Sequence, residues 1–287
     1  MQYDVIFPNI FNGIKIKTLN PVAFELFGLE VYWYGIIITI GIVAGYYLAY
    51  YRAGKMGLDR ELINDFVLYA VLAAVVGARL YYVVFSWQDY KNDWMQIFNL
   101  RNGGLAIYGA VIVAVIALLV FTKKKQVSFM KMADVAAPGL ILGQIIGRWG
   151  NFVNMEAFGG ASNGLFAMAI NWDKAKYIPQ GMENQATMID GFRYLQVAPT
   201  FLYESLFSLA VLLFMIWWTP KRKFDGEILC MYLFGYSLGR VWIEGMRTDQ
   251  LKLAYLGLPA SQVLAGILIV GAVIWWLYAR RKISLEK

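Results

Sequence analysis

Histidine is absent from this chain of 287 residues, and cysteine occurs only once, as Cys230. Without histidine, the chain cannot build histidine-ligated metal sites or catalytic triads that use an imidazole base. A single cysteine cannot form an intrachain disulfide, so cysteine usage does not identify a redox compartment. We therefore expect no metal site and no cofactor.

Charged residues are also scarce in this sequence. They make up 16% of the chain, compared with about 25% in soluble domains, whereas 60% of the residues are hydrophobic. This balance excludes an ordinary water-soluble fold. The net charge of +7 would by itself suit nucleic acid, but the positions of the basic residues favour a membrane topology and no nucleic-acid partner.

Seven apolar runs have about the 20 residues that a membrane-spanning helix needs. They lie at roughly 31–51, 62–86, 104–122, 132–153, 199–218, 227–244 and 259–279. We predict an all-α polytopic membrane protein with seven transmembrane helices, forming one integral membrane domain over residues 1–287. The polar segment at about 155–198 predicts a small extracytoplasmic cap between spans four and five. Residues 1–30 lack the pattern of a cleavable signal, so we expect the first span to be retained.

The distribution of lysine and arginine predicts the orientation of these spans. Of the 26 basic residues, 14 fall in the short segments 52–61, 123–131, 219–226 and 280–287. Nine fall on the opposite side, in longer segments, and three arginines lie inside spans. We therefore predict that the N-terminus is outside the cell and the C-terminus is in the cytoplasm.

The fourth apolar run carries an unusual polar stripe. On a helix, its polar side chains fall within a wedge of about 120°, and they are Gln144, Arg148, Asn151 and Asn154. An arginine at a bilayer centre costs roughly 2.5–3.5 kcal/mol on insertion scales, so an intramembrane ionisable residue indicates a functional site. Composition and spacing alone thus indicate a buried, basic, amide-rich site in a membrane protein.

The stretch at residues 147–159 also resembles a family signature. It is similar to the pattern Gly-Arg-x-Gly-Asn-Phe-x-Asn-x-Glu-x-x-Gly of the bacterial phosphatidylglycerol–prolipoprotein diacylglyceryl transferases, and it matches every fixed position. Four further segments resemble this family, namely Trp33-Tyr34-Gly35, residues 103–109, residues 199–204 and the pair Arg240 and Glu244.

The resemblance implies an enzyme of the bacterial cell membrane with phosphatidylglycerol and prolipoproteins as its partners. Such an enzyme transfers the diacylglyceryl group of the lipid to the lipobox cysteine beside a prolipoprotein signal peptide. A thioether forms and glycerol phosphate leaves, in the first step of bacterial lipoprotein maturation. The nucleophile then belongs to the substrate, so Cys230 is not required.

The same resemblance assigns residues to the site. The implied catalytic residues are Arg148, Arg240, Glu244 and Tyr108, and the implied substrate-binding residues are Arg148, Asn151, Asn154, Glu156, Gly159 and Tyr34. Guanidinium groups bind phosphate oxygens in pairs and stay charged, which suits a departing phosphate. Tyr108 stands where the family commonly has histidine, and an ordinary tyrosine, with a pKa near 10, suits a hydrogen-bond donor or orienting group. Glu244 and Glu156 are the candidate bases for the substrate thiol.

Simpler structural interpretations exist for several of these residues. Tyr34 is also typical of an aromatic belt at the membrane interface. Arg79 suits either snorkelling to headgroups or contact with a lipid phosphate. Arg240 and Glu244, at a spacing of i and i+4, also suit a self-contained ion pair. Glycines at four-residue spacing in the fourth span, which are Gly139, Gly143 and Gly147, predict close helix packing.

Two other classes of protein fit the same residues. A transporter or channel would use Arg148 and Arg240 to bind an anionic solute. A noncatalytic assembly or receptor protein would use the cap as its binding surface. Transfer of labelled lipid to a lipobox peptide distinguishes the enzyme from both.

Overall fold

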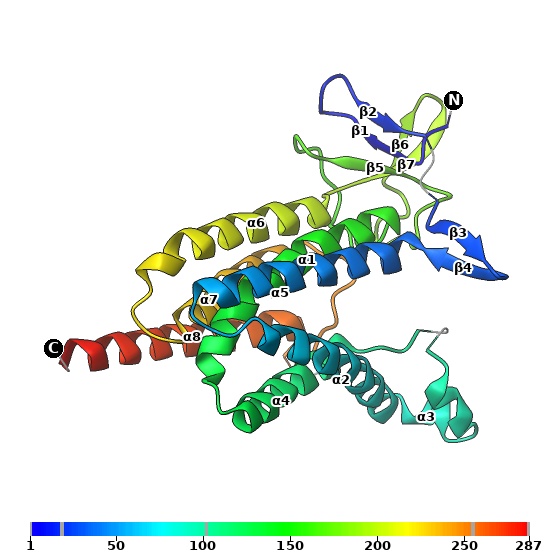
Figure 1. The fold of residues 1–287 in the computed structure, drawn as a ribbon. Coiled ribbons are helices and arrows are strands. Elements are labelled where there is room, and N and C mark those ends of the chain that lie inside the picture. Colours follow the sequence, from blue (N-terminus) through cyan, green and yellow to red (C-terminus); the bar gives the residue numbers. More distant parts are fainter. Residues whose placement is uncertain (1, 18–19, 101–102, 254–255, 286–287) are drawn as a thin grey trace. The chain divides into compact units, whose positions relative to one another are not determined.

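The computed structural model describes residues 2–17, 20–100, 103–253 and 256–285, and helices dominate it (Figure 1). Within these ranges the long helices are α1 (Trp33–Lys55), α2 (Glu61–Phe85), α4 (Ile107–Lys125), α5 (Phe129–Val153), α6 (Thr200–Trp218), α7 (Glu227–Glu244) and α8 (Ala260–Leu285). The short ones are α3 (Trp87–Tyr90), η1 (Trp94–Phe98) and η2 (Thr219–Lys221). Apolar runs form helices because, in lipid, a helix satisfies its backbone hydrogen bonds within one segment.

Six helices in the described part of the chain are long and apolar enough to cross a membrane. They are α1, α2, α4, α5, α6 extended to Lys221, and α8. The prediction of several apolar spans is therefore confirmed. Helix α7, which we predicted as the sixth of seven spans, is not among them, because its 18 residues include Glu227, Arg240 and Glu244. The count of seven stays a prediction.

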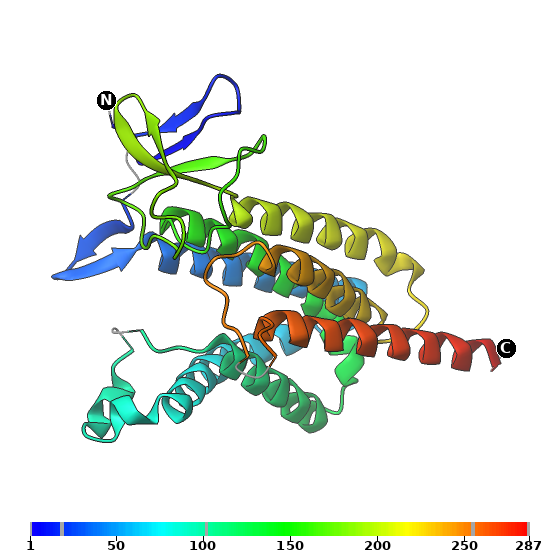
Figure 2. The same ribbon diagram turned by 180° about the vertical axis from the view of Figure 1, so that it is seen from behind.

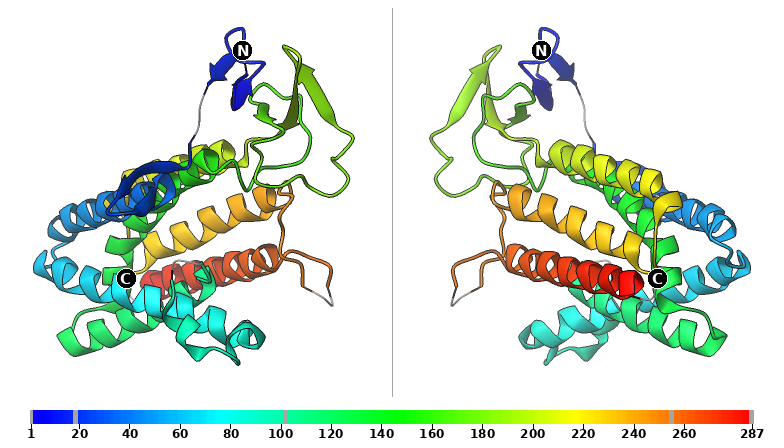
Figure 3. Two further views of the ribbon diagram at one scale, coloured as in Figure 1. Left: turned by 90° about the vertical axis from the view of Figure 1, so that its right-hand side faces the viewer. Right: turned by 90° about the vertical axis from the view of Figure 1, so that its left-hand side faces the viewer.

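A small antiparallel sheet joins two distant parts of the chain, so the prediction of an all-α fold is wrong in this respect. Its strands lie in the order β2-β1-β5-β7-β6, and Figure 3 shows the blue N-terminal strands close to the green strands of the later segment. The N-terminal segment supplies β1 (Val5–Phe7) and β2 (Ile14–Ile16). The polar segment at about 155–198, called the cap below, supplies β5 (Met168–Asn171), β6 (Ala186–Ile189) and β7 (Phe192–Val197). This segment is thus more regular than its polar composition indicates, and its extracytoplasmic position stays a prediction.

Local turn chemistry and alternating apolar residues build this sheet. Asp190 and Gly191 form the two-residue turn between β6 and β7 and both have positive φ, 51° and 84°, as a type I′ hairpin turn requires. Alternate residues of the strands face one core, which contains Val5, Ile170 and Leu195. The sheet therefore has a buried apolar face.

A second hairpin lies directly before the first long helix. It consists of β3 (Val22–Leu26) and β4 (Leu29–Tyr32), which form a two-stranded sheet and lead straight into α1. Its tip residue Phe27 is exposed and has a φ of 51°.

The described residues divide into two compact units. One comprises Met1–Gly45 and Ala137–Lys287, and the other comprises Tyr46–Ala136. In the first unit, α7 packs against both α6 and α8 (Figure 2). In the second, α2 and α4 cross so closely that a Cβ on Gly109 would lie 2.3 Å from the carbonyl oxygen of Gly77.

Glycines bring α1 and α5 together within the first unit. A Cβ on Gly139 would lie 2.5 Å from the carbonyl oxygen of Gly45, and a Cβ on Gly143 would lie 3.4 Å from that of Gly41. Small residues let two membrane helices approach backbone to backbone. The predicted use of the glycine stripe in packing is confirmed, and this contact fixes the helix that carries Arg148.

Candidate active site

The chain forms a tight turn directly after α5, which ends at Val153. Met155 and Ala157 both have left-handed backbone angles, with φ of 48° and 56°. This conformation costs an L-residue about 1–2 kcal/mol, and strain of this kind clusters at functional sites. The turn folds Glu156 back over the end of the helix, where its N–H donates to the carbonyl oxygen of Asn151 at 3.0 Å.

The Glu156 carboxylate gathers the amides of the signature. Asn151 Nδ2 and Asn154 Nδ2 donate to Glu156 Oε1 at 3.4 and 3.2 Å. Lys176 of the cap pairs with the other oxygen, Oε2. Three of the residues predicted to bind substrate therefore lie together, and Lys176 is a neighbour that the sequence analysis did not find.

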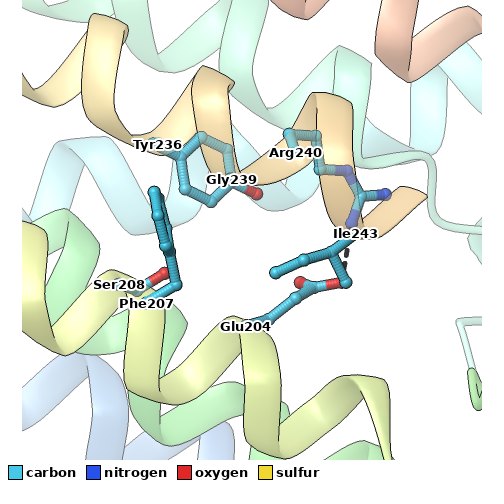
Figure 4. Close-up of a pocket in the computed structure, with 7 residues that line it drawn as sticks. All are labelled: Glu204, Phe207, Ser208, Tyr236, Gly239, Arg240 and Ile243. Atoms are coloured by element: carbon cyan, nitrogen blue, oxygen red, sulfur yellow. Dashed lines mark hydrogen bonds and ion pairs between the residues drawn. The ribbon is translucent and has the colours of Figure 1, made fainter. Parts of the chain in front are cut away.

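A second carboxylate, Glu204, joins two of the predicted catalytic arginines. Glu204 lies about one turn inside α6, whose first residue, Thr200, donates its hydroxyl to the carbonyl oxygen of Ala157. Glu204 Oε2 lies 2.5 Å from Nε of Arg148. Glu204 Oε1 lies 3.1 Å from Nη1 of Arg240, the pair drawn in Figure 4. Glu204 is buried, so it acts as a shared counter-ion in an apolar setting.

The pair predicted from i, i+4 spacing on α7 is present. Arg240 Nη2 lies 2.7 Å from Glu244 Oε2. Because Arg240 also contacts Glu204, the pair is not self-contained. It extends the cluster that holds Arg148, and the predicted catalytic residues Arg148, Arg240 and Glu244 lie in one network.

Arg247 adds a third cation just beyond α7. Its guanidinium lies 3.8 Å from Glu204 and 3.9 Å from Glu244, and it donates twice to Asp249, at 2.9 and 2.8 Å. Burial opposes the charge on Arg247, but Asp249, Glu204 and Glu244 outweigh it and raise its pKa. Burial alone would raise the pKa of Asp249, yet the two hydrogen bonds from Arg247 hold it below its usual value.

A small pocket opens between α6 and α7 beside this network. It is lined by Glu204, Phe207, Ser208, Tyr236, Gly239, Arg240 and Ile243 (Figure 4). Its enclosed free space is about 10 Å³, room for roughly one water molecule. The pocket therefore marks a gap between α6 and α7 beside Arg240 and is too small to enclose a ligand.

Two further predicted residues are Tyr34, which packs against the signature, and Gly159, which ends it. The ring of Tyr34 covers Gly150, where a Cβ would lie 2.7 Å from Tyr34 Cδ2. Gly159 forms an antiparallel bridge with Arg247, and its N–H donates to the carbonyl oxygen of Ala198 at 2.9 Å. A Cβ on Gly159 would lie 2.9 Å from that of Ala198, so a side chain would disturb the segment that carries Arg247.

Tyr108 belongs to the other compact unit, in α4, where its ring lies 6.4 Å from that of Tyr81. Its catalytic role stays a prediction. Arg79 lies in the same unit, and its guanidinium donates to the backbone carbonyl oxygens of Gln96, Ile97, Asn99, Gly103 and Gly104 at 2.6–2.9 Å. These contacts favour a structural role for Arg79 over contact with a lipid phosphate.

Four residues of the site were not predicted from the sequence, namely Glu204, Arg247, Asp249 and Lys176. Glu204 carried a usable signal, since a carboxylate one turn inside an apolar helix needs a cationic partner. Arg247 follows Glu244 at i+3, a spacing that allows contact. Lys176 carried no signal, because its contact depends on how the cap folds.

Fold and site together define a multi-pass membrane protein with a partly buried cluster of arginines and carboxylates that is suited to an anionic ligand. The family model described as prolipoprotein diacylglyceryl transferase matches residues 21–278, and the chain belongs to this family. The family resemblance predicted from the signature is thereby confirmed.

Curated relatives cover nearly the whole chain. A protein of Synechocystis sp. is 41% identical over 279 residues, which are 95% of this chain and 94% of the relative. One of Geobacillus kaustophilus is 44% identical over 93% of this chain and 95% of its own length, and one of Clostridioides difficile is 38% identical over 92% and 97%. Each is named phosphatidylglycerol–prolipoprotein diacylglyceryl transferase.

Proposed function

We propose that this chain transfers the diacylglyceryl group of phosphatidylglycerol to the cysteine thiol of prolipoproteins, the first step of lipoprotein maturation. The observation that carries the proposal is the pairing of Arg148 and Arg240 with one buried carboxylate, Glu204. Family membership and relatives about 40% identical over nearly their full length support the same activity.

The chemistry is a displacement at carbon. The substrate sulfur attacks the glyceryl carbon of the lipid, and the bond between that carbon and the phosphate oxygen breaks. A thioether forms, and glycerol phosphate leaves with the electron pair. Negative charge grows on the leaving phosphate, so cations already in place stabilise the transition state more than the ground state.

The cluster can keep such cations in place before the lipid arrives. Arg148 and Arg240 are each partly accessible, and carboxylates hold them at 2.5–3.1 Å. A phosphate can replace a carboxylate oxygen without reorientation of the guanidinium, because both anions match its planar fork. In this proposal the two arginines bind the phosphate, and Glu204 keeps them oriented in the empty site.

The other predicted residues receive supporting roles. Glu244 orients Arg240 and is the first candidate to accept the thiol proton. The amides around Glu156, with Tyr34 beside Gly150 and the tight turn at Gly159, form the rest of the substrate-binding surface. Tyr108 acts as a hydrogen-bond donor to substrate.

We further propose a single transferase domain in the bacterial plasma membrane, with seven spans, α7 included, an outside N-terminus and a cytoplasmic C-terminus. The polar site then lies toward the outer face, where exported prolipoproteins arrive. Accessibility labelling of cysteines engineered at residues 123–125 and 170–180 tests this, and the sole native thiol, on Cys230, is buried. Labelling of residues 123–125 from outside would overturn the orientation.

A reconstituted transfer assay tests the function itself. Purified protein is mixed with phosphatidylglycerol labelled in its acyl chains and a synthetic lipobox peptide, and label on the peptide is measured together with released glycerol phosphate. We expect both, and neither with a peptide in which serine replaces the lipobox cysteine. Uptake of glycerol phosphate into vesicles without peptide labelling would indicate a transporter, and peptide binding without transfer would indicate a receptor.

A further inference from the structure

One tyrosine of the cap reaches the loop that carries Arg247. Tyr177 lies between β5 and β6, and its ring stacks on that of buried Phe158, with centroids 4.9 Å apart and planes at 10°. Its hydroxyl oxygen lies 2.9 Å from Oγ1 of Thr248, the residue after Arg247. Burial raises the pKa of Tyr177, so its hydroxyl keeps its proton at neutral pH.

The direction of this hydrogen bond follows from its neighbours. Thr248 Oγ1 lies 3.1 Å from the carbonyl oxygen of Phe158. A carbonyl oxygen only accepts, so the single hydroxyl proton of Thr248 goes to Phe158. Tyr177 must therefore donate to Thr248. The result is a chain of two hydrogen bonds in one direction, from Tyr177 through Thr248 to the backbone of Phe158.

These hydrogen bonds fix the backbone at Thr248, directly after Arg247. The N–H of Thr248 also donates to the carbonyl oxygen of Phe158, at 3.3 Å, and the N–H of Gly160 donates to that of Met246, at 3.1 Å. Arg247 thus lies between two residues that are tied to the signature turn. Tyr177 provides the side-chain contact that holds this loop from the cap.

The preceding residue, Lys176, contacts the polar cluster around Glu156. Lys176 pairs with Glu156, which accepts from the amides of Asn151 and Asn154. Two neighbouring cap residues therefore contact two parts of the same site. Because the sheet shares one apolar core with Phe158 and with Phe201 of α6, it is a firm support for both contacts.

We propose that Tyr177 is a positioning residue for the transfer reaction, acting through Thr248 to hold the Arg247 guanidinium beside Glu204 and Glu244. This inference rests on the proposed function, since it requires Arg247 to act on the anionic substrate. Tyr177 does not touch the reacting atoms. Its contribution is to keep the third cation in the geometry that favours the departing phosphate.

Removal of the hydroxyl alone tests the proposal. Tyr177→Phe keeps the ring stacked on Phe158 and loses only the bond to Thr248. We expect kcat/KM for lipid transfer to fall about five- to tenfold, an effect of the size that one lost hydrogen bond gives, with unchanged folded yield and a Tm no lower than that of the control variant below, which loses a bond of the same kind. Thr248→Val removes this bond and also the bond from Thr248 to Phe158, so its loss should be at least as large. Thr248→Ser keeps both donors and acceptors and should retain wild-type activity.

A matched control exists within the cap. The Tyr194 hydroxyl also donates to a backbone carbonyl, that of Tyr3, at 2.9 Å, and accepts from the N–H of Tyr3 at 3.1 Å. It lies in a different cluster, with Ile6 and Ala169. Tyr194→Phe should leave kcat/KM unchanged, because its contacts do not lead to Arg247.

A double-mutant cycle separates positioning from general support of the fold. In an Arg247→Lys background the guanidinium fork is gone, so Tyr177→Phe should cause no further loss. An equal loss in both backgrounds would show that Tyr177 supports only the fold, and wild-type activity in Tyr177→Phe would overturn the proposal directly. Absence of transfer by the wild-type protein would instead contradict the proposed function.

Discussion

Arg79 and Arg148 both lie in long apolar helices, one in each compact unit, yet they hold their charge in different ways. The guanidinium of Arg79 donates to five backbone carbonyl oxygens, all from residues 96–104. That of Arg148 pairs with the carboxylate of Glu204, which Arg240 shares. In sequence the two arginines look alike, since each is a cation in an apolar run.

The kind of partner distinguishes a structural arginine from a ligand-binding one. Five backbone carbonyls saturate the five N–H donors of Arg79 and cannot be exchanged without unfolding the loop to which they belong. Carboxylates are anions of the same shape and charge type as a phosphate edge, so a phosphate can replace them. We therefore expect substitution of Arg148 to lower transfer activity and substitution of Arg79 to lower stability.

The largest effect should come from Arg148→Lys. Lysine keeps the charge but loses the planar fork, and removal of one preorganised donor to a developing anion typically costs about 10²–10³-fold in kcat. We expect a loss of about 100-fold or more in transfer, measured with labelled lipid at matched protein levels. Near-normal transfer would contradict bidentate recognition of the phosphate and make Arg148 resemble Arg79.

Arg79→Lys should lower the stability of the protein and leave its activity unchanged. Three ammonium donors cannot serve five carbonyls, and each buried acceptor left unsatisfied costs about 1–3 kcal/mol. We expect the free energy of unfolding to fall by about 1–2 kcal/mol, because water can reach part of the loop. Thermal unfolding in detergent measures this, and kcat/KM of the folded protein should stay at the wild-type value. Lost transfer at an unchanged Tm would show that Arg79 contacts substrate.

Much of this contrast lies beyond what a sequence reveals, for a physical reason. Hydropathy identifies the long helices because the length and composition of a span are local properties. The partners of Arg79 come from a loop about 20 residues later, and those of Arg148 from a helix more than 50 residues later. Side-chain type predicts that an intramembrane arginine has a partner, but the choice between carbonyl and carboxylate depends on tertiary packing.

The small sheet was also not predicted from the sequence, although one of its turns carries a recognisable hairpin signal. Its strands are three to six residues long, and β1 pairs with β5 across more than 150 residues of sequence. Such short strands give little periodicity. The dipeptide Asp190-Gly191 has positive φ and forms the two-residue turn between β6 and β7, and such a dipeptide is the strongest short-range hairpin signal. It identifies that hairpin, although not its pairing with the other strands.

Glu244→Gln tests whether Glu244 only orients Arg240 or also accepts the thiol proton. An amide still accepts a hydrogen bond from Arg240 but carries no charge, so Arg240 loses half of its ion pairing. If Glu244 mainly orients Arg240, kcat should fall by about tenfold, or about 1.4 kcal/mol, with an unchanged pH profile. A much larger loss with retained lipid binding and a shifted pH profile would assign the thiol proton to Glu244.

The smallest effect is expected at the edge of the network, for Asp249→Asn. Asp249 is the most exposed of the three carboxylates around Arg247, and an asparagine keeps one of its two hydrogen bonds from that guanidinium. We expect a loss of about threefold in kcat/KM, the lower range for a partly solvated ion pair. The Tyr194→Phe variant serves again as the control.

The pH dependence of this small effect gives a sharper test. Arg247 lowers the pKa of Asp249 below the usual value of about 4, so the carboxylate is ionised throughout the neutral range. For a lowered pKa, the stabilising contribution is present above the unfolded value and is lost as pH falls through the folded one. The ratio of wild-type to Asp249→Asn activity should therefore stay constant from about pH 6 to 8. A ratio that changes within that range would mean that Asp249 titrates there, and that Arg247 is held less firmly than its two hydrogen bonds indicate.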